Sequence, residues 1–318
     1  MLTLSKDNSD KQKAAGHSLR RRLHAWWEGY ELPTGASGSR GAGKGVAVDE
    51  PEEAEMPPVS RGDWSGARQD LVQMLWGAGF SVPGEPEYIL ELVKPFGLTN
   101  ANTMLEFGAG MGGGARTVAG KIGCYVDAFE MNAGLVQKAR ELAVVADIDK
   151  KAVFKPYDPP SLELKKKYYD AALIRETLML VSDKAHFLET IIAALKPNTA
   201  MVIADFFIST AEPGAAAADS IASENRDLFP CDAETVVDIL EGAGLELRIN
   251  ADETDRYVAM VKAAWHNVAA RIAQEPQDST VMEVLKQEID FWTLRNQAFD
   301  SGEIRMRRIV GFKKSSVV

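Results

Sequence analysis

A glycine-rich stretch at residues 105–114, LEFGAGMGGG, carries the strongest chemical signal in this sequence. It follows an apolar segment that is predicted to be a strand and precedes a segment that is predicted to be a helix. A strand that ends in such a turn favours a nucleotide site. Glycines let the backbone approach the ligand, and the N-terminus of the helix presents N–H groups without intrahelical partners. Gly108, Gly110 and Gly112 fit this role, while Gly108, Gly110 and Gly113 also satisfy the dinucleotide pattern.

An acidic residue at the end of the next predicted strand strengthens the nucleotide hypothesis. Glu130 lies about 20 residues past the loop, where a carboxylate accepts hydrogen bonds from both ribose hydroxyls. NAD enzymes and methyltransferases share this feature, so it indicates a nucleoside without naming it. Tyr157-Asp158 after the third predicted strand, and the segments 169–174 and 195–205, are typical of S-adenosylmethionine sites. Asp158 also precedes a proline, so a role as a turn residue stays open.

Composition restricts the other classes of function. The net charge of −10 argues against a general nucleic-acid binder, which needs a concentrated positive surface. Two distant cysteines, Cys124 and Cys231, indicate a reducing compartment rather than a disulfide scaffold. The four histidines show no metal-ligand spacing with them, so no metal is predicted. Neither a signal peptide nor an apolar run of about 18 residues is present, and we expect a soluble, cytoplasmic protein.

Strands alternate with helices along the middle of the chain. This alternation predicts an α/β fold of the Rossmann-like kind, with a mostly parallel seven-stranded sheet and helices on both faces. Within a catalytic domain at 61–318, we expect a helical segment at 61–100, a cofactor-binding core at 101–210, and cap helices with the last strands at 211–318. The expected strands are 103–107, 124–129, 152–155, 170–174, 201–205, 245–249 and 308–313, and the expected helices are 64–76, 86–96, 114–120, 133–145, 184–195, 233–243, 257–273 and 281–299. The alanine-rich segment 211–218 is either a helix or a loop.

The first sixty residues have a different composition. Residues 17–30 form a predicted basic amphipathic helix, 35–45 read as a flexible linker, and 49–58 are acidic with prolines. Such a composition buries little apolar surface, so 1–60 is expected to be a mobile arm. Packing on its own domain, contact with a membrane surface and contact with a protein partner all stay open for the helix.

Several segments make the chain similar to class I S-adenosylmethionine-dependent methyltransferases, in particular the phosphoethanolamine and sarcosine/dimethylglycine N-methyltransferases. The likeness runs from about Trp64 to Lys314. It is carried by the segments Trp76–Phe80 with Pro83-Gly84, Glu106–Arg116, Ile174–Leu178 with Ser182–Lys184, Asp252–Tyr257 and Gly311–Lys313. The resemblance implies S-adenosyl-L-methionine as cofactor and a small-molecule acceptor.

The resemblance also implies roles for particular residues. Arg175 would lie near the carboxylate end of the cofactor, and Glu176 would meet the acceptor amine, although pairing with a nearby cation is the structural alternative. The predicted cofactor-binding residues are Glu106, Gly108, Ala109, Gly110, Gly112, Glu130, Met131, Tyr157, Asp158 and Arg175. The predicted catalytic residues are Glu176 and Trp64, and the predicted substrate-pocket residues are Phe80, Phe206 and Arg226.

This sequence departs from the family at the reacting amine. The phosphoethanolamine enzymes carry a tyrosine–histidine pair there, and the aligned positions are Trp64 and Leu180, neither of which exchanges a proton. Two further tyrosines correspond to Phe206 and Leu228. We therefore expect a more apolar pocket and a small acceptor other than phosphoethanolamine. Its aromatic rings either contact a cation through their faces or belong to the core.

The leading hypothesis is in-line methyl transfer to a small molecule, in particular an amine, in which the protein holds nucleophile, methyl carbon and sulfur in line. The missing tyrosine–histidine pair motivates a second hypothesis, a cofactor-binding protein with little or no catalysis that engages a partner through its N-terminal arm. An NAD(P)-dependent oxidoreductase is a third hypothesis. It lacks a Tyr-x-x-x-Lys or similar hydride-transfer set in this sequence.

Overall fold

The structure is a computed structural model that describes residues 60–274 and 279–314. The helix, linker and acidic stretch expected in the arm lie outside these ranges. The proposed domain division therefore stays a prediction, and the unit that begins at Arg61 is described by itself.

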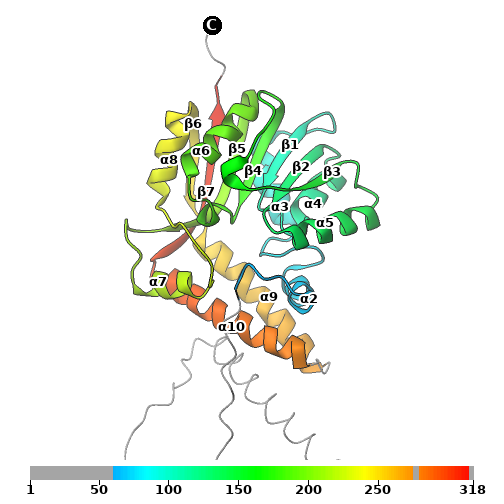
Figure 1. Ribbon diagram of the computed structural model, residues 1–318, viewed down its shortest axis with the longest axis vertical. Coiled ribbons are helices and arrows are strands. Elements are labelled where there is room, and N and C mark those ends of the chain that lie inside the picture. Colours follow the sequence, from blue (N-terminus) through cyan, green and yellow to red (C-terminus); the bar gives the residue numbers. More distant parts are fainter. Residues whose placement is uncertain (1–59, 275–278, 315–318) are drawn as a thin grey trace, which may run out of the picture. The chain divides into compact units, whose positions relative to one another are not determined.

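Seven strands form one sheet in the order β3-β2-β1-β4-β5-β7-β6 (Figure 1). Strands β1 to β5 pair in parallel, and β7 pairs antiparallel with both β5 and β6. The expected mostly parallel, seven-stranded Rossmann-like sheet is thus confirmed. The strands are β1 (Thr103–Phe107), β2 (Tyr125–Glu130), β3 (Ala152–Pro156), β4 (Tyr169–Arg175), β5 (Leu195–Ile208), β6 (Leu245–Asp252) and β7 (Ile304–Lys313).

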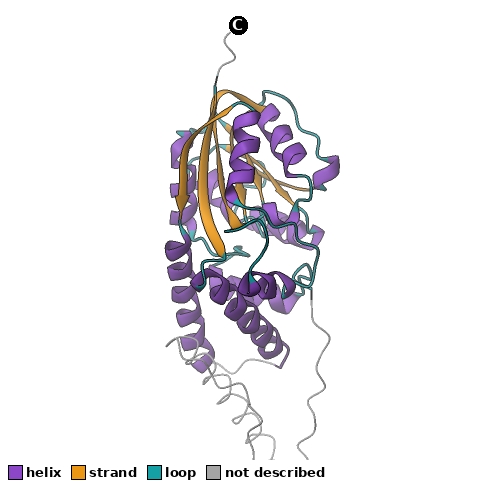
Figure 2. Ribbon diagram, turned by 90° about the vertical axis from the view of Figure 1, so that its left-hand side faces the viewer, coloured by secondary structure: helices purple, strands orange, loops and turns teal. Residues whose placement is uncertain are grey.

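Helices cover both faces of the sheet, as Figure 2 shows from the side. Helices α4 and α5 pack on β2 and β3, while α6 packs on β5 and on α8. The helices are α2 (Gly66–Trp76), α3 (Pro86–Val93), α4 (Gly113–Lys121), α5 (Ala133–Val145), α6 (Lys184–Ala194), α7 (Ala215–Ala222), α8 (Ala233–Gly242), α9 (Thr254–Gln274) and α10 (Ser279–Asp300), with short 3₁₀ turns η1 (Lys94–Phe96), η2 (Pro159–Ser161) and η3 (Leu178–Leu180).

Side-chain caps fix where several helices begin. The carboxylate of Asp183 accepts from the His186 amide at 2.9 Å, and that of Asp232 accepts from the Thr235 amide at 2.7 Å. Asn132 does the same for α5, where its side-chain oxygen lies 3.0 Å from the Leu135 amide. Each cap satisfies an N–H group that has no partner inside the helix. The expected helix starts after these residues are confirmed.

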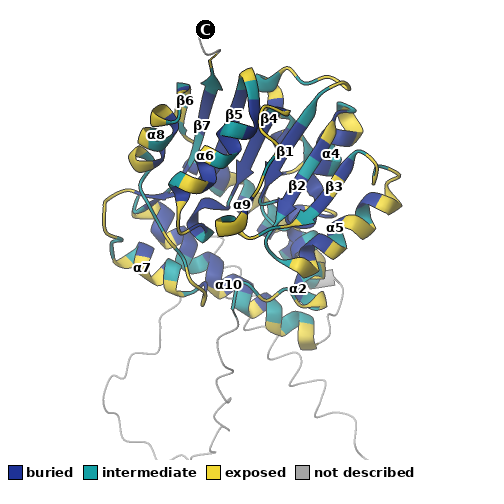
Figure 3. Cartoon of the chain, turned by 45° about the horizontal axis from the view of Figure 1, so that its top comes forward, coloured by how far each residue is buried: buried dark blue, intermediate teal, exposed yellow. Residues whose placement is uncertain are grey.

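The principal core lies between the sheet and helices α6 and α8. Figure 3 shows the buried strands at the centre of the layers. Phe107, Phe187 and Leu240 represent β1, α6 and α8 in this cluster, and each is fully buried. The burial of large apolar side chains contributes about 1.5–3 kcal/mol for each residue, which makes this layer the main support of the strand ends.

Helices α2, α7, α9 and α10 gather at one end of the sheet (Figure 1). Helix α10 contacts α2, α7 and α9, and α2 also contacts α9. Phe206, close to the end of β5, packs on Tyr257 of α9 and Phe299 of α10. These helices therefore cover the carboxyl ends of the parallel strands, where open α/β sheets bind ligands.

Candidate functional site

The loop between β1 and α4 adopts a conformation that requires glycine. Gly108, Gly110 and Gly112 have φ values of 77°, 54° and 83°. A Cβ atom on Gly108 would lie 2.0 Å from the carbonyl oxygen of Arg175, and one on Gly110 would lie 1.9 Å from Ser81 Oγ. The left-handed backbone and these approaches together exclude side chains, so the loop is a cradle of main-chain atoms.

Glu130 lies at the end of β2 against this loop. Its carboxylate accepts hydrogen bonds from the amides of Gly110 and Asn132, both at 2.9 Å. Burial raises the pKa of Glu130, while the same amides lower it. A carboxylate has more acceptor positions than these two bonds use, so Glu130 retains capacity for ligand hydroxyls.

Glu106 is buried beside the first turn of α4. Its side chain is 1% exposed, and neither carboxylate oxygen has a hydrogen-bond partner. A Cβ atom on Gly114 would lie 2.1 Å from Glu106 Oε1, so the carboxylate touches the helix backbone. Burial raises the pKa of Glu106 to about 7, although the charge of Arg175 and the nearby Ala115 amide, which makes no hydrogen bond of ordinary geometry, lower it.

Arg175 lies next to the glycine loop and directly precedes Glu176, whose surroundings we call the acceptor side of the site. It is 4% exposed at the end of β4, and its Nη2 atom donates to the carbonyl of Pro83 at 3.0 Å. Its charge lowers the pKa of both Glu106 and Glu176. The position is suited to the carboxylate of an amino-acid ligand.

The remaining predicted cofactor residues lie around the same strand ends. Ala109 is buried and donates its amide to Phe129, while Met131 is half-buried after β2. Tyr157 packs on Phe107, and its buried hydroxyl has no hydrogen-bond partner. Asp158 is exposed and accepts from Ser161 Oγ at 3.1 Å. That contact belongs to the turn, so the adenine contact stays a prediction.

Glu176 follows β4 with a φ of 45°, a left-handed value that is uncommon for a residue other than glycine. Its amide donates to the carbonyl of Ala204 at 3.1 Å. Asp205, which is fully buried, accepts from the amides of Thr177 and Leu178 at 2.7 and 2.9 Å. The neighbouring strand β5 therefore holds the backbone that presents Glu176.

The electrostatic surroundings of Glu176 combine burial with nearby cations and carboxylates. Burial raises its pKa to about 7, Arg175 opposes this rise, and Asp205 adds to it. Tyr257 of α9 donates its hydroxyl to Glu176 Oε1 at 3.1 Å. Burial also raises the pKa of Asp205 to about 6, against the amides that it accepts. Glu176 can therefore change its protonation state near neutral pH.

The aromatic residues predicted for the substrate pocket are mostly packed against protein. Phe206 is 9% exposed and lies 5.3 Å from the Tyr257 ring, with the guanidinium of Arg295 5.0 Å from its centroid. Phe80 is buried against the glycine loop, since a Cβ atom on Gly113 would lie 2.7 Å from its ring. These environments are those of core residues, so contact of either ring with an acceptor stays a prediction.

Arg226, which was predicted for the substrate pocket, belongs to an arginine–glutamate cluster near Phe206 whose other members the sequence did not indicate. Glu224 pairs with Arg226 at 2.6 Å and with Arg295 at 2.8 Å. Arg226 and Arg295 lower the pKa of Glu224 although burial opposes them, and burial lowers the pKa of Arg295. Arg295 is 2% exposed, and its Nε and Nη1 atoms have no hydrogen-bond partner. Residues 71 positions apart carry no local spacing signal, so tertiary structure alone reveals this pair.

A second set of ion pairs, centred on Glu288, lies next to the pairs of Glu224. Glu288 of α10 pairs with Arg61 and, at 2.9 Å, with Arg68 of α2. Trp64 is half-buried, and the guanidinium of Arg68 lies 4.2 Å from its ring centroid. The Arg61 amide donates to the carbonyl of Glu224 at 2.8 Å. Four arginines thus face two glutamates, which leaves the cluster with excess positive charge.

The segment that contains Trp64 also reaches the cofactor side. Asn132 donates its side-chain amide to the carbonyl of Gly62 at 3.0 Å, next to the Glu130 carboxylate. The segment 61–64 therefore runs between the cofactor loop and the arginine–glutamate cluster. The ring of Trp64 lies against Arg68 of this cluster, and its predicted catalytic role stays a prediction.

The residues at these strand ends fit S-adenosylmethionine by their chemistry. Glu130 suits the ribose hydroxyls, the main-chain cradle of Gly108 and Gly110 admits close approach of a ligand, and Arg175 suits the carboxylate of its methionine part. The unpartnered oxygens of Glu106 would offer hydrogen-bond acceptors to the amino group of the methionine part. No group of three or more metal-ligating side chains occurs within the described ranges.

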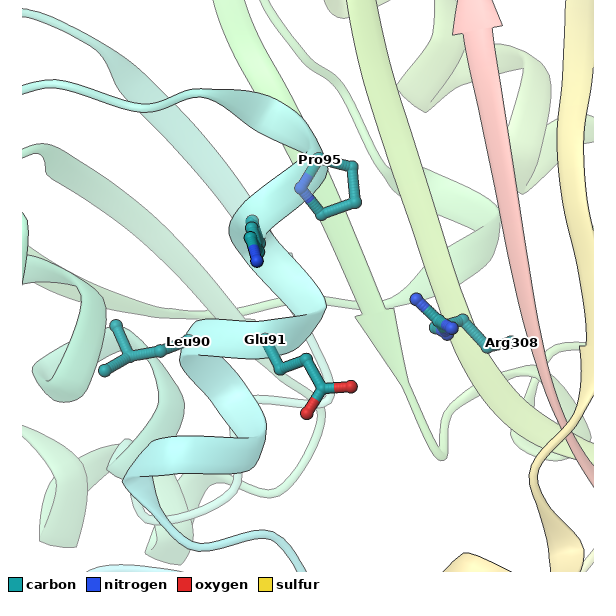
Figure 4. A pocket seen from close by; sticks show the side chains of 5 residues that line it. Leu90, Glu91, Pro95 and Arg308 are labelled. Carbon is teal, nitrogen blue, oxygen red and sulfur yellow. The ribbon is translucent and has the colours of Figure 1, made fainter.

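A cavity of about 620 Å³ lies outside this site, between α3–η1 and β7 (Figure 4). It is lined by Leu90, Glu91, Lys94, Pro95 and Arg308. Glu91 is paired with Arg256, and Arg308 is paired with Glu253. Because Glu91 and Arg308 are already engaged in ion pairs, we place the chemistry at the strand ends. Among the helices that the structure describes, none has the length and apolar character needed to cross a membrane.

Comparisons with known proteins agree with this geometry. A family model described as a methyltransferase domain matches residues 84–248, just over half of the chain. The chain is 25% identical over 190 residues to phosphoethanolamine N-methyltransferase 1 of Arabidopsis thaliana, covering 60% of this chain and 38% of that protein. It is 23% identical over 248 residues to the enzyme of the same name from Zea mays, covering 76% and 47%. The chain spans less than half the length of these relatives.

Solved structures share the fold. Phosphoethanolamine N-methyltransferase 2 of Haemonchus contortus, in complex with phosphomonomethylethanolamine and S-adenosylhomocysteine, aligns with a TM-score of 0.68 at 18% identity, covering 78% of this chain and 57% of that chain. A putative sarcosine dimethylglycine methyltransferase from Galdieria sulphuraria aligns with a TM-score of 0.64 at 13% identity, covering 79% and 99%. These likenesses establish the fold that the sequence resemblance implied.

Proposed function

This chain belongs to the family of methyltransferase domains, whose methyl donor is S-adenosylmethionine, and we propose that it methylates the nitrogen of a small amine. The observation that carries the proposal is the Glu176 carboxylate. It stands at the end of β4, between the cofactor loop and the cap helix α9. A carboxylate in that place can orient an ammonium group toward the cofactor.

S-adenosylmethionine supplies an electrophilic methyl group when it is bound. The chain's own residues then have two tasks. Asp205 and Ala204 hold the backbone of Glu176, so that its carboxylate meets the acceptor nitrogen in a fixed position. An ammonium must also lose one proton before its lone pair can attack. Glu176, with a pKa of about 7, can accept that proton and pass it to water.

The arginine–glutamate cluster supports an acceptor that carries an acidic group in addition to its amine. Arg295 is buried with unpartnered Nε and Nη1 atoms, and Arg226 lies beside it on the same glutamate. Guanidinium groups in this setting suit a carboxylate or a phosphate. The relatives are named for phosphoethanolamine, which has both an amine and a phosphate. The absence of the tyrosine–histidine pair at Trp64 and Leu180 still favours a different amine of this class.

A methyl-transfer assay with a panel of acceptors tests the proposal. The panel contains phosphoethanolamine, ethanolamine, sarcosine, dimethylglycine, a phenol and a thiol, with labelled S-adenosylmethionine as donor. We expect N-methylation of an amine, at least tenfold slower in Glu176→Gln and unchanged in Glu189→Gln, an exposed glutamate on α6. Methylation of the phenol or thiol alone, or normal turnover by Glu176→Gln, would contradict the proposal.

The binding-protein hypothesis makes a different prediction in the same assay. It requires cofactor binding with no transfer to any acceptor. Nothing in the described part of the chain favours it over an enzyme, since the carboxylates, the arginines and the glycine loop all meet at one site.

A further inference from the structure

Tyr257 supplies a hydroxyl at the acceptor side, where the resemblance pointed to an absent tyrosine–histidine pair. It lies in the first turn of α9, more than eighty positions from Glu176 in sequence, and its hydroxyl donates to Glu176 Oε1 at 3.1 Å. Tyr257 is 1% exposed. The hydroxyl is therefore shielded from water and has the carboxylate as its hydrogen-bond acceptor.

The ring of Tyr257 is fixed on several sides. Its centroid lies 5.3 Å from that of Phe206, 6.0 Å from that of Phe299 and 6.5 Å from that of Trp292. The Tyr257 amide donates to the carbonyl of Glu253 at 2.9 Å, which anchors the start of the helix. Edge-to-face packing of this kind holds a ring in one orientation. The hydroxyl consequently stays aimed at Glu176.

We propose that Tyr257 is a positioning residue, whose hydroxyl holds one oxygen of Glu176 and leaves the other oxygen for the amine of the acceptor. The inference rests on the proposed function, because it takes Glu176 as the group that meets the amine. It assigns a task to a residue of the cap rather than of the cofactor-binding core.

The charged and titratable groups around Glu176 make this task measurable. Burial raises its pKa, and so does Asp205 of β5, while Arg175 of β4 and Arg295 of α10 lower it. The Tyr257 hydrogen bond also lowers it, and Tyr88 of α3 faces the same carboxylate. Removing the hydroxyl withdraws one stabilising contact from the ionised form. The Glu176 carboxyl should then keep its proton to a higher pH.

Tyr257→Phe in the full chain is the direct test, since it keeps the ring and removes the hydroxyl. The matched control is Tyr169→Phe, which removes a hydroxyl 2.7 Å from Asp127 Oδ2, near the amino ends of the strands. The first readout is the ¹³C resonance of the Glu176 side-chain carboxyl, assigned by its loss in Glu176→Gln and titrated from pH 5 to 9. This readout needs no acceptor. Thermal melting confirms that each variant is folded.

We expect the Glu176 titration to move up by about one pH unit in Tyr257→Phe and to stay in place in Tyr169→Phe. The second readout is the pH profile of kcat/KM for the amine that the acceptor panel identifies. Its acidic limb should move by the same amount, with the high-pH plateau lowered several-fold. A purely structural role would lower the plateau without moving the limb.

An unchanged titration and an unchanged limb in Tyr257→Phe would overturn this inference, even where Glu176→Gln is at least tenfold slower than wild type. Normal turnover by Glu176→Gln is a separate outcome, and it would overturn the proposed function itself. The two failures are therefore distinguishable within one set of variants.

Discussion

Glu106→Gln is expected to stabilise the protein at alkaline pH and to weaken its binding of the cofactor. The Glu106 carboxylate is 1% exposed and has no hydrogen-bond partner for either oxygen. Burial therefore raises its pKa from 4.5 to about 7. An ionised carboxylate in this place costs free energy that a neutral amide of the same shape does not.

The magnitude follows from the linkage of proton binding to folding. Between pH 4.5 and about 7 the folded state keeps the Glu106 proton while the unfolded chain has lost it. The contribution of this group to stability therefore falls as pH rises through that window, and it stays low above it. The whole interval corresponds to roughly 3 kcal/mol of unfolding free energy.

Urea unfolding at pH 5.5 and pH 8.5, without cofactor, measures the effect. Wild type should lose about 2 kcal/mol more than Glu106→Gln between these two conditions, because pH 5.5 already lies inside the window. Glu189→Gln, which replaces an exposed glutamate, should behave as wild type. Calorimetry with S-adenosylmethionine should show about tenfold weaker binding by Glu106→Gln, from the loss of one charge-assisted hydrogen bond. An identical pH dependence in wild type and variant, or a less stable variant at pH 8.5, would refute the reasoning.

Other changes test the remaining parts of the site. Glu130→Gln should weaken binding of S-adenosylmethionine at least tenfold in calorimetry, and unaltered affinity would remove Glu130 from the ribose site. Gly110→Ala places a Cβ atom 1.9 Å from Ser81 Oγ at a φ of 54°, so it should lower the melting temperature and the cofactor affinity, and adding Ser81→Gly should restore part of both. Asp205→Asn leaves at least one buried amide without an acceptor, which should lower the free energy of unfolding in urea by about 2 kcal/mol and slow turnover. Normal turnover would show that Asp205 is not needed to hold Glu176 in position. Arg256→Gln removes an exposed ion pair with Glu91 and should change stability by less than about 1 kcal/mol, so a larger effect would indicate that this pair holds α9 on α3.

The cofactor half of the site could be predicted from the sequence because its signals are local. Gly108, Gly110 and Gly112 follow one strand directly, and Glu130 ends the next strand. Parallel strands joined by helices bring their carboxyl ends to one edge, so alternation along the chain is enough to place these residues together. The positive φ values of the three glycines agree with the reason for expecting glycine there.

Element boundaries were less predictable where tertiary pairing sets them. Strand β5 extends through Ile208 and β7 starts at Ile304, both beyond the expected segments. Their antiparallel pairing joins Asp205 with Arg307 and Phe207 with Arg305, so the partner strand satisfies backbone groups next to charged side chains. A search for apolar alternation stops at such residues, because the pairing that extends the strand lies about a hundred positions away.

The acceptor half of the site was decided by tertiary structure. The sequence identified Glu176 through a resemblance, but its hydroxyl partner Tyr257 comes from α9, and Arg295, which lowers its pKa, comes from α10. No spacing in the sequence relates Arg295 to Glu224, or Tyr257 to Glu176, because the packing of the cap helices creates these contacts. The sequence by itself therefore determined the sheet and brought the glycine loop and Glu130 to one edge of it, where chain order fixes proximity. The surroundings of Glu176 depend on how distant helices pack, and only the folded structure provides them.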